Sequence, residues 1–242
     1  MLQACLNGSR PVDAHPALPV IARHLARDAR AVARYGVTSV HIHPRCPAGL
    51  ESIDSAHVGE AVASIRAEVA NMEIGVPAAR WVQPDARDRV EAVLSWGKLG
   101  HGKPDIVSVN VHDQGWRQVC AAAHAVGIKV ELGVWTSGDV VELRKAGIPD
   151  GTARVIAEST VPSKDAAVAE AIRIVRSLGQ LPVPILLHGE EGGAWAVLEY
   201  AMRMGMDTRI GFEDVLLRPD NWLATGNDDL VHSAINIRNP VG

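Results

Sequence analysis

Residues 105–134 read DIVSVNVHDQGWRQVCAAAHAVGIKVELGV, and this stretch contains one complete strand–helix–strand pattern. Two short apolar runs, at 105–111 and 129–134, flank a helical pattern at 115–126. Gly127 follows the helical pattern, as a C-terminal cap does. Short strands that are apolar on both faces are typical of a sheet covered by helices. The stretch therefore predicts one βα repeat of a parallel α/β fold.

The same alternation continues along the whole chain, in units of roughly 30 residues. Eight such units predict a single (β/α)8 TIM barrel spanning residues 1–242, because no linker or low-complexity tract divides the sequence. A doubly wound open sheet would show the same alternation, although no Gly-x-Gly-x-x-Gly motif follows the first strand. The other expected strands lie near 2–7, 37–43, 73–78, 153–157, 183–188 and 207–213, and the other expected helices near 19–35, 56–70, 85–97, 138–146, 164–179, 191–205 and 227–237.

Composition excludes several classes of protein. The chain has 47% hydrophobic and 21% charged residues with a net charge of −4, which gives no basic surface for nucleic acid. No basic and apolar leader opens the sequence, and no apolar run is long enough to cross a membrane. Three widely spaced cysteines, Cys5, Cys46 and Cys120, do not suggest a disulfide framework. We therefore expect a cytoplasmic protein that binds neither nucleic acid nor membranes.

The tripeptide His41-Ile42-His43 closes a strand-like apolar run. Side chains alternate between the two faces of a strand, so His41 and His43 point the same way. Two imidazoles on one face can hold one divalent metal ion. Each histidine taken alone has a structural interpretation as well, as a side chain satisfied by its neighbours or by solvent.

The last expected strand supplies the complementary groups. Arg209, Gly211 and Glu213 alternate with apolar residues and should face the barrel interior, where charges need partners. Glu213 ends this strand at the level where His41 and His43 end theirs, and Gly211 should leave room beside an ion. Two imidazoles and one carboxylate leave open coordination positions, as catalytic metals require. Asp214, held by Arg209, is then a candidate general base.

Two middle strands carry polar groups on one face. Ser108 and Asn110 share a face on one strand, and Glu131 lies within the apolar run of the next. Glu131 is expected either in the site or as an ion-pair partner of Arg209. His188 ends the seventh apolar run and is either a hydrogen-bonded core histidine or a ligand. Cys46, three residues after His43, is a less favoured fourth ligand because Pro44 and Pro47 indicate a turn leading away.

These motifs together resemble the β-keto acid cleavage enzyme family, which includes 3-keto-5-aminohexanoate cleavage enzyme. The resemblance rests on HIHPR at 41–45, on TRIGFED at 208–214, and on shorter matches at 6–8, 108–110 and 130–135. It extends over about residues 2–238. The segment at 208–214 is its most specific part.

The resemblance implies a zinc-dependent barrel with one ion per subunit, held by His41, His43 and Glu213. It implies that a β-keto acid and acetyl-CoA exchange an acyl group, giving acetoacetate and a new acyl-CoA. The residue that removes the substrate proton in this family matches Asp214, and the arginine that positions it matches Arg209. The resemblance also assigns Ser108, Asn110 and Glu131 to the substrate pocket, and it suggests a homo-oligomer, a dimer or tetramer.

The sequence departs from the family pattern at two places. Where the family often has a Ser-Thr-Gly turn after the third strand, this chain has PAAR at 77–80, so a hydroxyl that assists proton transfer is missing. After Gly8, the family has an acidic residue that binds the substrate's amino group. In this chain Arg10 stands in its place, and the neighbouring Ser9 is the other residue that could match that position. We therefore expect Arg10 either to bind an anionic substrate tail or to lie on a solvated loop.

Two other functions fit parts of the pattern. A metal-dependent TIM-barrel hydrolase also uses His-x-His, usually on the first strand and with further histidines from middle strands. Here the fifth and sixth strands offer Glu131 and Glu158 instead. A non-catalytic barrel that binds a metal or metabolite would explain the ligands but not the adjacent pair of Arg209 and Asp214.

Overall fold

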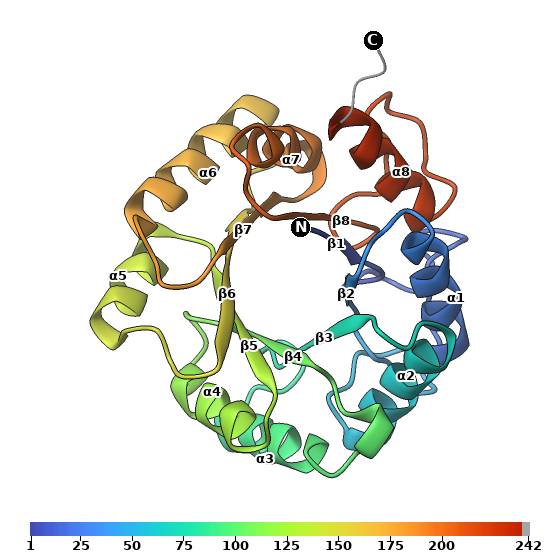
Figure 1. The fold of residues 1–242 in the computed structure, drawn as a ribbon, viewed down its shortest axis with the longest axis vertical. Helices are drawn as coiled ribbons and strands as arrows, with labels where there is room; N and C mark the ends of the chain where they lie inside the picture. The colour runs from blue at the N-terminus through green and yellow to red at the C-terminus, as the bar shows by residue number, and fades with distance from the viewer. Residues whose placement is uncertain (239–242) are drawn as a thin grey trace.

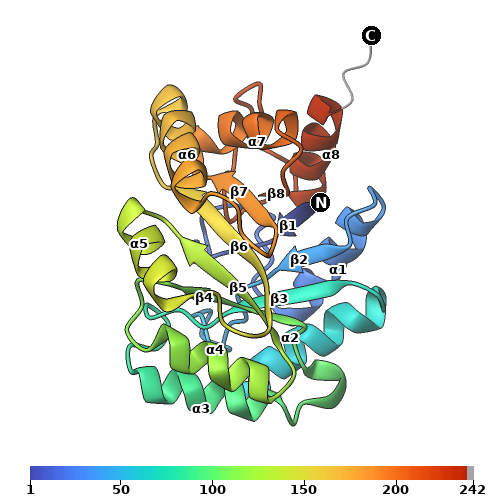
Figure 2. The same ribbon diagram turned by 60° about the vertical axis from the view of Figure 1, so that its left-hand side comes forward.

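The computed structural model describes residues 1–238, and the fold in this range is a (β/α)8 barrel, as the sequence predicts. Eight parallel strands form the inner wall, and the helices form an outer ring around it (Figures 1 and 2). The strands are β1 Leu2–Cys5, β2 Ser39–His41, β3 Glu73–Pro77, β4 Ile106–Asn110, β5 Lys129–Val134, β6 Thr152–Ser159, β7 Ile185–Gly189 and β8 Thr208–Ile210.

Each strand is followed in the chain by its covering helix, and the longest connecting segments are those after β1, β2 and β8. The helices are α1 Ala22–Ala33, α2 Ser55–Glu68, α3 Ala86–Trp96, α4 Trp116–Ala125, α5 Ser137–Ala146, α6 Lys164–Leu178, α7 Ala194–Arg203 and α8 Asn227–Arg238. Two short 3-10 turns, Gly100–Gly102 and Glu191–Gly193, precede β4 and α7. Gly127 adopts φ +70°, the left-handed conformation that a glycine cap after α4 requires.

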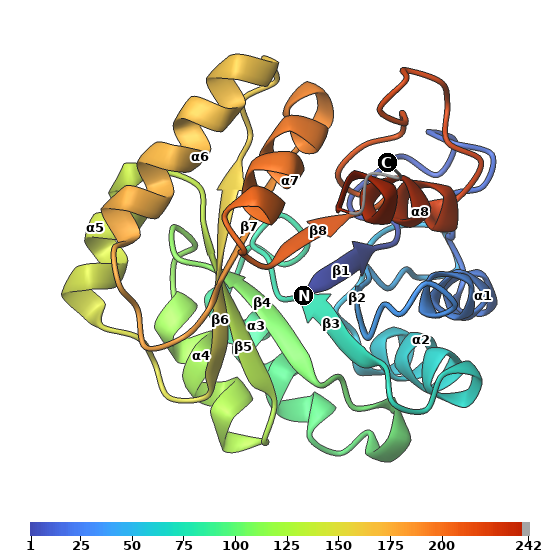
Figure 3. The ribbon, with the colours of Figure 1, turned by 45° about the horizontal axis from the view of Figure 1, so that its top comes forward.

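Backbone pairing runs without a break from β7 through β6, β5, β4, β3, β2 and β1 to β8. The ring closes between β7 and β8 by a single bridge, Leu186 to Asp207, and a hydrogen bond from the amide of Leu187 to the carbonyl of Asp207. The first and last strands therefore lie side by side, with α8 against both of them (Figure 3).

The hydrophobic core lies between the strands and the helices, where Val40, Ile42 and Ile74 are fully buried. The barrel interior is polar instead. Arg154 on β6 donates to Glu131 on β5 at 2.8 Å and also pairs with Glu73 on β3. Since a buried charge is stable only when paired, these ion pairs hold the centre of the barrel together below the site.

Among residues 1–238, no helix is long and apolar enough to span a membrane. The three cysteines are all free thiols, with Cys5 and Cys120 buried and Cys46 partly buried. Burial raises the pKa of Cys120 to about 12, so this thiol is not reactive.

Candidate metal centre and active site

The three predicted metal ligands meet at the carboxyl ends of their strands. His41 ends β2, His43 follows two residues later, and Glu213 comes three residues after β8 rather than within it. The Nε2 atoms of His41 and His43 lie 3.2 Å apart, and Oε2 of Glu213 lies 4.0 Å and 3.6 Å from them. A point equidistant from the three atoms in their plane is about 2.1 Å from each, which matches zinc–ligand distances of about 2.0–2.2 Å.

The other nitrogen of each imidazole is occupied, which directs both Nε2 atoms into the site. Nδ1 of His43 lies 2.6 Å from Oε2 of Glu51, which also accepts a 3.3 Å bond from the indole of Trp81. Nδ1 of His41 lies 3.5 Å from Oγ of Ser108. A carboxylate behind a ligating histidine fixes its tautomer and raises its basicity.

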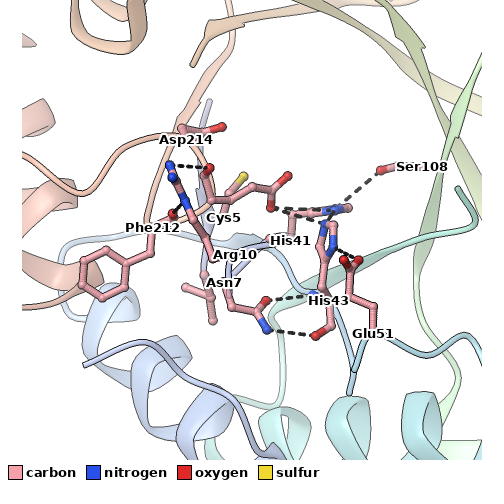
Figure 4. A network of polar contacts seen from close by, with 12 residues as sticks. Cys5, Asn7, Arg10, His41, His43, Glu51, Ser108, Phe212 and Asp214 are labelled. Atoms are coloured by element: carbon pink, nitrogen blue, oxygen red, sulfur yellow. Dashed lines mark hydrogen bonds and ion pairs between the residues drawn. The ribbon is translucent and has the colours of Figure 1, made fainter. Parts of the chain in front are cut away.

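Sequence reasoning missed Glu51. It lies in the loop after β2, which turns back so that Arg45 and Glu51 form an antiparallel bridge, and its carboxylate faces His43 (Figure 4). The only indication of Glu51 in the sequence is that a carboxylate follows His43 by eight residues in the same loop. The local pattern does not show that this loop turns back toward His43.

The loop after β1 contacts two of the candidate ligands, His43 and Glu213. The side chain of Asn7 donates to the carbonyl of His43 at 2.9 Å and accepts from its amide at 2.8 Å (Figure 4). Gly8, at φ +54°, packs against Glu213, since a Cβ there would come within 2.5 Å of Cγ of Glu213. Only glycine combines that backbone conformation with that approach.

The charges suit a cation. Burial raises the pKa of Glu213, but Arg209, His41 and His43 outweigh it and hold the pKa well below its ordinary value. Burial lowers the pKa of His41 to about 4, whereas Glu213 and Glu51 overcome burial at His43 and raise its pKa to about 9. Oε2 of Glu213 is buried and accepts no hydrogen bond from residues 1–238. An ionised oxygen without a partner, facing two imidazole nitrogens, fits a divalent cation.

Arg209 and Asp214 form the predicted pair. The guanidinium donates to Oδ1 of Asp214 at 3.0 and 2.8 Å and to Oε1 of Glu213 at 2.9 Å. Asp214 is fully buried, and within the described part of the chain its Oδ2 accepts no hydrogen bond. Arg209 lines the cavity above the ligands, whereas Asp214 lies behind it.

This cavity has a volume of about 230 Å³. Its wall includes the three candidate ligands, Arg209, and the predicted Ser108 and Asn110. Gly133 makes room for the amide of Asn110, since a Cβ there would lie 2.2 Å from Oδ1. The lining residues that were not predicted as site residues include Trp81, Trp135, Ile156, Glu158 and Glu190.

Two predicted substrate-binding residues do not line the cavity. Glu131 is fully buried beneath it and accepts a 3.0 Å bond from Ser108, so it supports the hydroxyl that contacts His41. The expectation that Glu131 pairs with Arg209 is wrong, because Arg154 takes that place. The sequence does not show which inward-facing arginine lies at the same height in the barrel as Glu131.

Arg10 is also placed differently from either expectation. Its guanidinium donates to the carbonyls of Phe212 at 2.8 Å and Glu213 at 3.2 Å and pairs with Glu191. It therefore holds the segment that carries Glu213, and its donors are not directed at a substrate tail. Ser9, the neighbouring option, lines the cavity.

Two smaller expectations also change. A Cβ at Gly211 would lie 2.0 Å from the carbonyl oxygen of Cys5, so this glycine makes room for the backbone of β1 rather than for an ion. Cys46 lies in a separate surface groove with Arg23 and His57, outside the cluster of candidate ligands.

Comparison with known proteins agrees with this geometry. The model of the beta-keto acid cleavage enzyme family matches residues 1–242, and no curated protein sequence matches. The apo structure of ObcA has a TM-score of 0.69 at 16% identity, over 91% of this chain and 61% of that chain. ObcA is also known in a binary complex with oxaloacetate and in a ternary complex with a C4-CoA adduct and oxalate.

A 3-dehydroquinate dehydratase from Geobacillus kaustophilus HTA426 has a TM-score of 0.64 at 11% identity, over 99% of this chain and 90% of that chain. Identities this low show a shared fold and no more. The chain spans 61–63% of the length of the ObcA chains it matches. The family match, in contrast, runs over the whole sequence, and the chain belongs to the β-keto acid cleavage enzyme family.

Proposed function

We propose that this protein condenses a β-keto acid with acetyl-CoA and cleaves the product to acetoacetate and a new acyl-CoA, with one zinc ion per subunit. The observation that carries the proposal is the convergence of His41, His43 and the unpartnered Oε2 of Glu213 in one cavity with Arg209. Family membership supports the reaction class. ObcA, which binds oxaloacetate and a CoA adduct, shares the fold.

A divalent ion held by His41, His43 and Glu213 would polarise the ketone of the keto acid and acidify the neighbouring C–H bond. Glu51 and Ser108 keep the two imidazoles oriented for that ion. Their task is to keep the ligand atoms in place while the keto acid binds.

We assign the proton transfer to the pair of Asp214 and Arg209. Oδ1 of Asp214 is held by the guanidinium, and Oδ2 is free to accept a proton from the carbon next to the ketone. Since Arg209 separates Asp214 from the cavity, the reacting carbon must approach beside the guanidinium. Arg209 then also faces the substrate carboxylate, with Asn110 as a neutral partner on the opposite wall.

The test is to incubate the purified protein with acetyl-CoA and a panel of β-keto acids and to measure its metal content in parallel. Acetoacetate and a new acyl-CoA are the expected products, with about one zinc per chain. The reaction should stop when acetyl-CoA is left out. His41→Ala should abolish both metal binding and turnover, whereas Glu60→Gln, on the exposed face of α2, should change neither.

Other results would favour the alternatives. Turnover of the keto acid without CoA would contradict the proposal and favour a hydrolase. Bound metal with neither reaction would favour a binding role. The fully buried carboxylate of Asp214 beside the ligands argues for chemistry, because burying a further charge is costly and the contact of Arg209 with Glu213 does not require it.

A further inference from the structure

Two tryptophans line the cavity on the side away from Arg209. Trp81 follows β3 and Trp135 follows β5, so the two side chains flank the carboxyl end of β4. The centroids of their rings lie 6.3 Å apart. In the ring of eight strands, β4 lies opposite β8, which carries Arg209 (Figure 1).

This side of the cavity is apolar. Trp81 is 49% exposed although it lines the cavity, so the folded chain leaves a large apolar surface open there. Pro77, Ala79 and Ile156 continue the same apolar wall. Open apolar surface in a concave site is where the apolar part of a ligand binds.

Both indole rings are held in place before a ligand binds. The indole N–H of Trp81 donates to Oε2 of Glu51 at 3.3 Å. The ring of Trp135 packs edge-on against His112, with the centroids 4.6 Å apart, and its amide donates to Asp139 at 2.8 Å. Rings fixed in this way lose little conformational entropy when they contact a ligand.

The cationic residues that line the cavity all have other partners among residues 1–238. The two histidines are expected to hold the ion, and Arg209 is bound to Glu213 and Asp214. Glu158 and Glu190 add negative charge on the side of β6 and β7. A second carboxylate on the substrate would therefore find no counter-charge inside the cavity, which makes its burial costly.

The carboxylate next to Trp135 already has its own counter-charge. One ring nitrogen of the fully buried His188 lies 3.4 Å from Oε2 of Glu158, and the other lies 3.4 Å from Oδ1 of Asp214. Burial and Arg209 lower the pKa of His188, but these two carboxylates outweigh them and raise it to about 9. His188 is therefore a buried cation and not a metal ligand, and Glu158 does not need a cationic substrate.

We infer that the β-keto acid carries an uncharged, apolar tail beyond its ketone, and that Trp81 and Trp135 select this tail. With the substrate carboxylate at Arg209 on β8 and the ketone at the ion, the rest of the molecule extends across the barrel toward β3–β5. There it meets the two indole rings. The tryptophans determine specificity and take no part in proton transfer, and the inference rests on the proposed function.

The test uses pairs of β-keto acids that share a shape and differ in charge. 6-Methyl-3-oxoheptanoate has a neutral tail with the shape of the anionic tail of 3-oxoadipate. 5,5-Dimethyl-3-oxohexanoate has a neutral tail with the shape of the cationic tail of 4-(trimethylammonio)-3-oxobutanoate. The value of kcat/KM for acetoacetate formation from acetyl-CoA is measured for each acid with the zinc-loaded protein. The KM for acetyl-CoA is measured separately.

The wild type should prefer the neutral acid over its anionic partner by at least about 100-fold, because the second carboxylate would be unpaired in an apolar site. It should prefer the neutral acid over the cationic one by about tenfold or more, since attraction of a cation to the indole rings offsets only part of the cost of desolvation. Lengthening 3-oxopentanoate to 3-oxohexanoate should raise kcat/KM about fourfold, the gain expected from one buried methylene.

Three variants test the tryptophans: Trp81→Ala, Trp135→Ala and a matched control, Trp222→Ala, which is exposed on the segment after β8 and does not line the cavity. In the first two, the ratio of kcat/KM for 6-methyl-3-oxoheptanoate to that for 3-oxopentanoate should fall at least about tenfold. The KM for acetyl-CoA should stay within twofold, and the control should match the wild type. Trp135 does not touch Glu51, so Trp135→Ala separates tail binding from any effect on the metal ligands. Metal content and thermal unfolding show whether each variant is loaded and folded.

Several results would overturn the inference. The wild type could prefer the anionic or the cationic acid to its neutral partner. Both tryptophan variants could keep the wild-type ratio, or could raise the KM for acetyl-CoA instead, which would place CoA on the indole rings. In each case acetoacetate still forms, so the proposed function stands. Absence of acetoacetate formation with every acid and with zinc bound would refute the proposed function itself.

Discussion

Replacing Glu51 should weaken metal binding although Glu51 is not expected to touch the metal. Its carboxylate lies 2.6 Å from Nδ1 of His43, the shortest polar contact of either candidate ligand histidine. Removing a group that orients a metal-bound histidine typically costs about 10- to 100-fold in affinity, or about 1.4–2.8 kcal/mol. Glu51→Gln keeps an oxygen at that position and loses the charge, so we expect about a tenfold loss. Glu51→Ala removes both and should approach 100-fold.

The measurement is the dissociation constant for zinc, by competition with a chromogenic chelator at pH 7.5. Glu60→Gln on α2 makes the same charge change on an exposed surface and should leave the constant within twofold. Unfolding curves of the metal-free proteins show whether a loss of affinity reflects a loss of fold. Equal affinities for the wild type and Glu51→Ala would refute the assignment of Glu51. A Glu60→Gln effect as large as that of Glu51→Gln would show that only long-range charge is involved.

Four other changes have expected outcomes. Adding zinc at 100 times its dissociation constant to the metal-free protein should stabilise the fold by about 2.7 kcal/mol, and a chelator should reverse the shift in thermal unfolding. Asp214→Asn should lower the exchange of the keto acid's C2 hydrogens in D2O at least about 100-fold with zinc still bound, and undiminished exchange would exclude it as the base. Gly211→Ala should lower the free energy of unfolding by more than about 3 kcal/mol, since its Cβ would lie 2.0 Å from the Cys5 carbonyl oxygen. Gly36→Ala, whose Cβ would meet no atom within 4 Å, should lower it by less, as measured by chemical denaturation. Protonated His188 stabilises the fold below its unfolded pKa of 6.5, and this contribution should be lost as pH rises to its folded value of about 9. The slope is at most about 1.4 kcal/mol per pH unit, and His188→Gln should flatten it.

The sequence was sufficient for the fold because each βα unit has its own local signals. The apolar run at 129–134 corresponds residue for residue to β5, and the glycine after α4 has the expected left-handed backbone. The boundaries were less accurate at strand ends that lead into the site. The expected strand to Glu213 ends at Ile210, because a turn carries Glu213 across to Gly8.

The site was predictable where alternation along one strand decides which way a side chain points. His41, Arg209, Ser108 and Asn110 face the cavity for that reason. Contacts set by loops or by distant strands were not predictable. Glu51 reaches His43 only because its loop turns back, and nothing in the sequence shows that turn. Arg10 and Glu131 were assigned to the substrate because the sequence does not reveal the partners that take up their charges.

The neighbouring positions of β1 and β8 have a consequence for how the protein is made. His43 and Glu213 are about 170 residues apart in the chain, and closing a loop of that length costs entropy that only a folded barrel repays. During synthesis, the two histidines emerge long before their carboxylate partner, and Asn7 and Gly8 hold the two halves together only once β8 has paired with β1. A nascent chain should therefore bind zinc weakly until its last strand is in place, and tight metal loading would report that folding is complete.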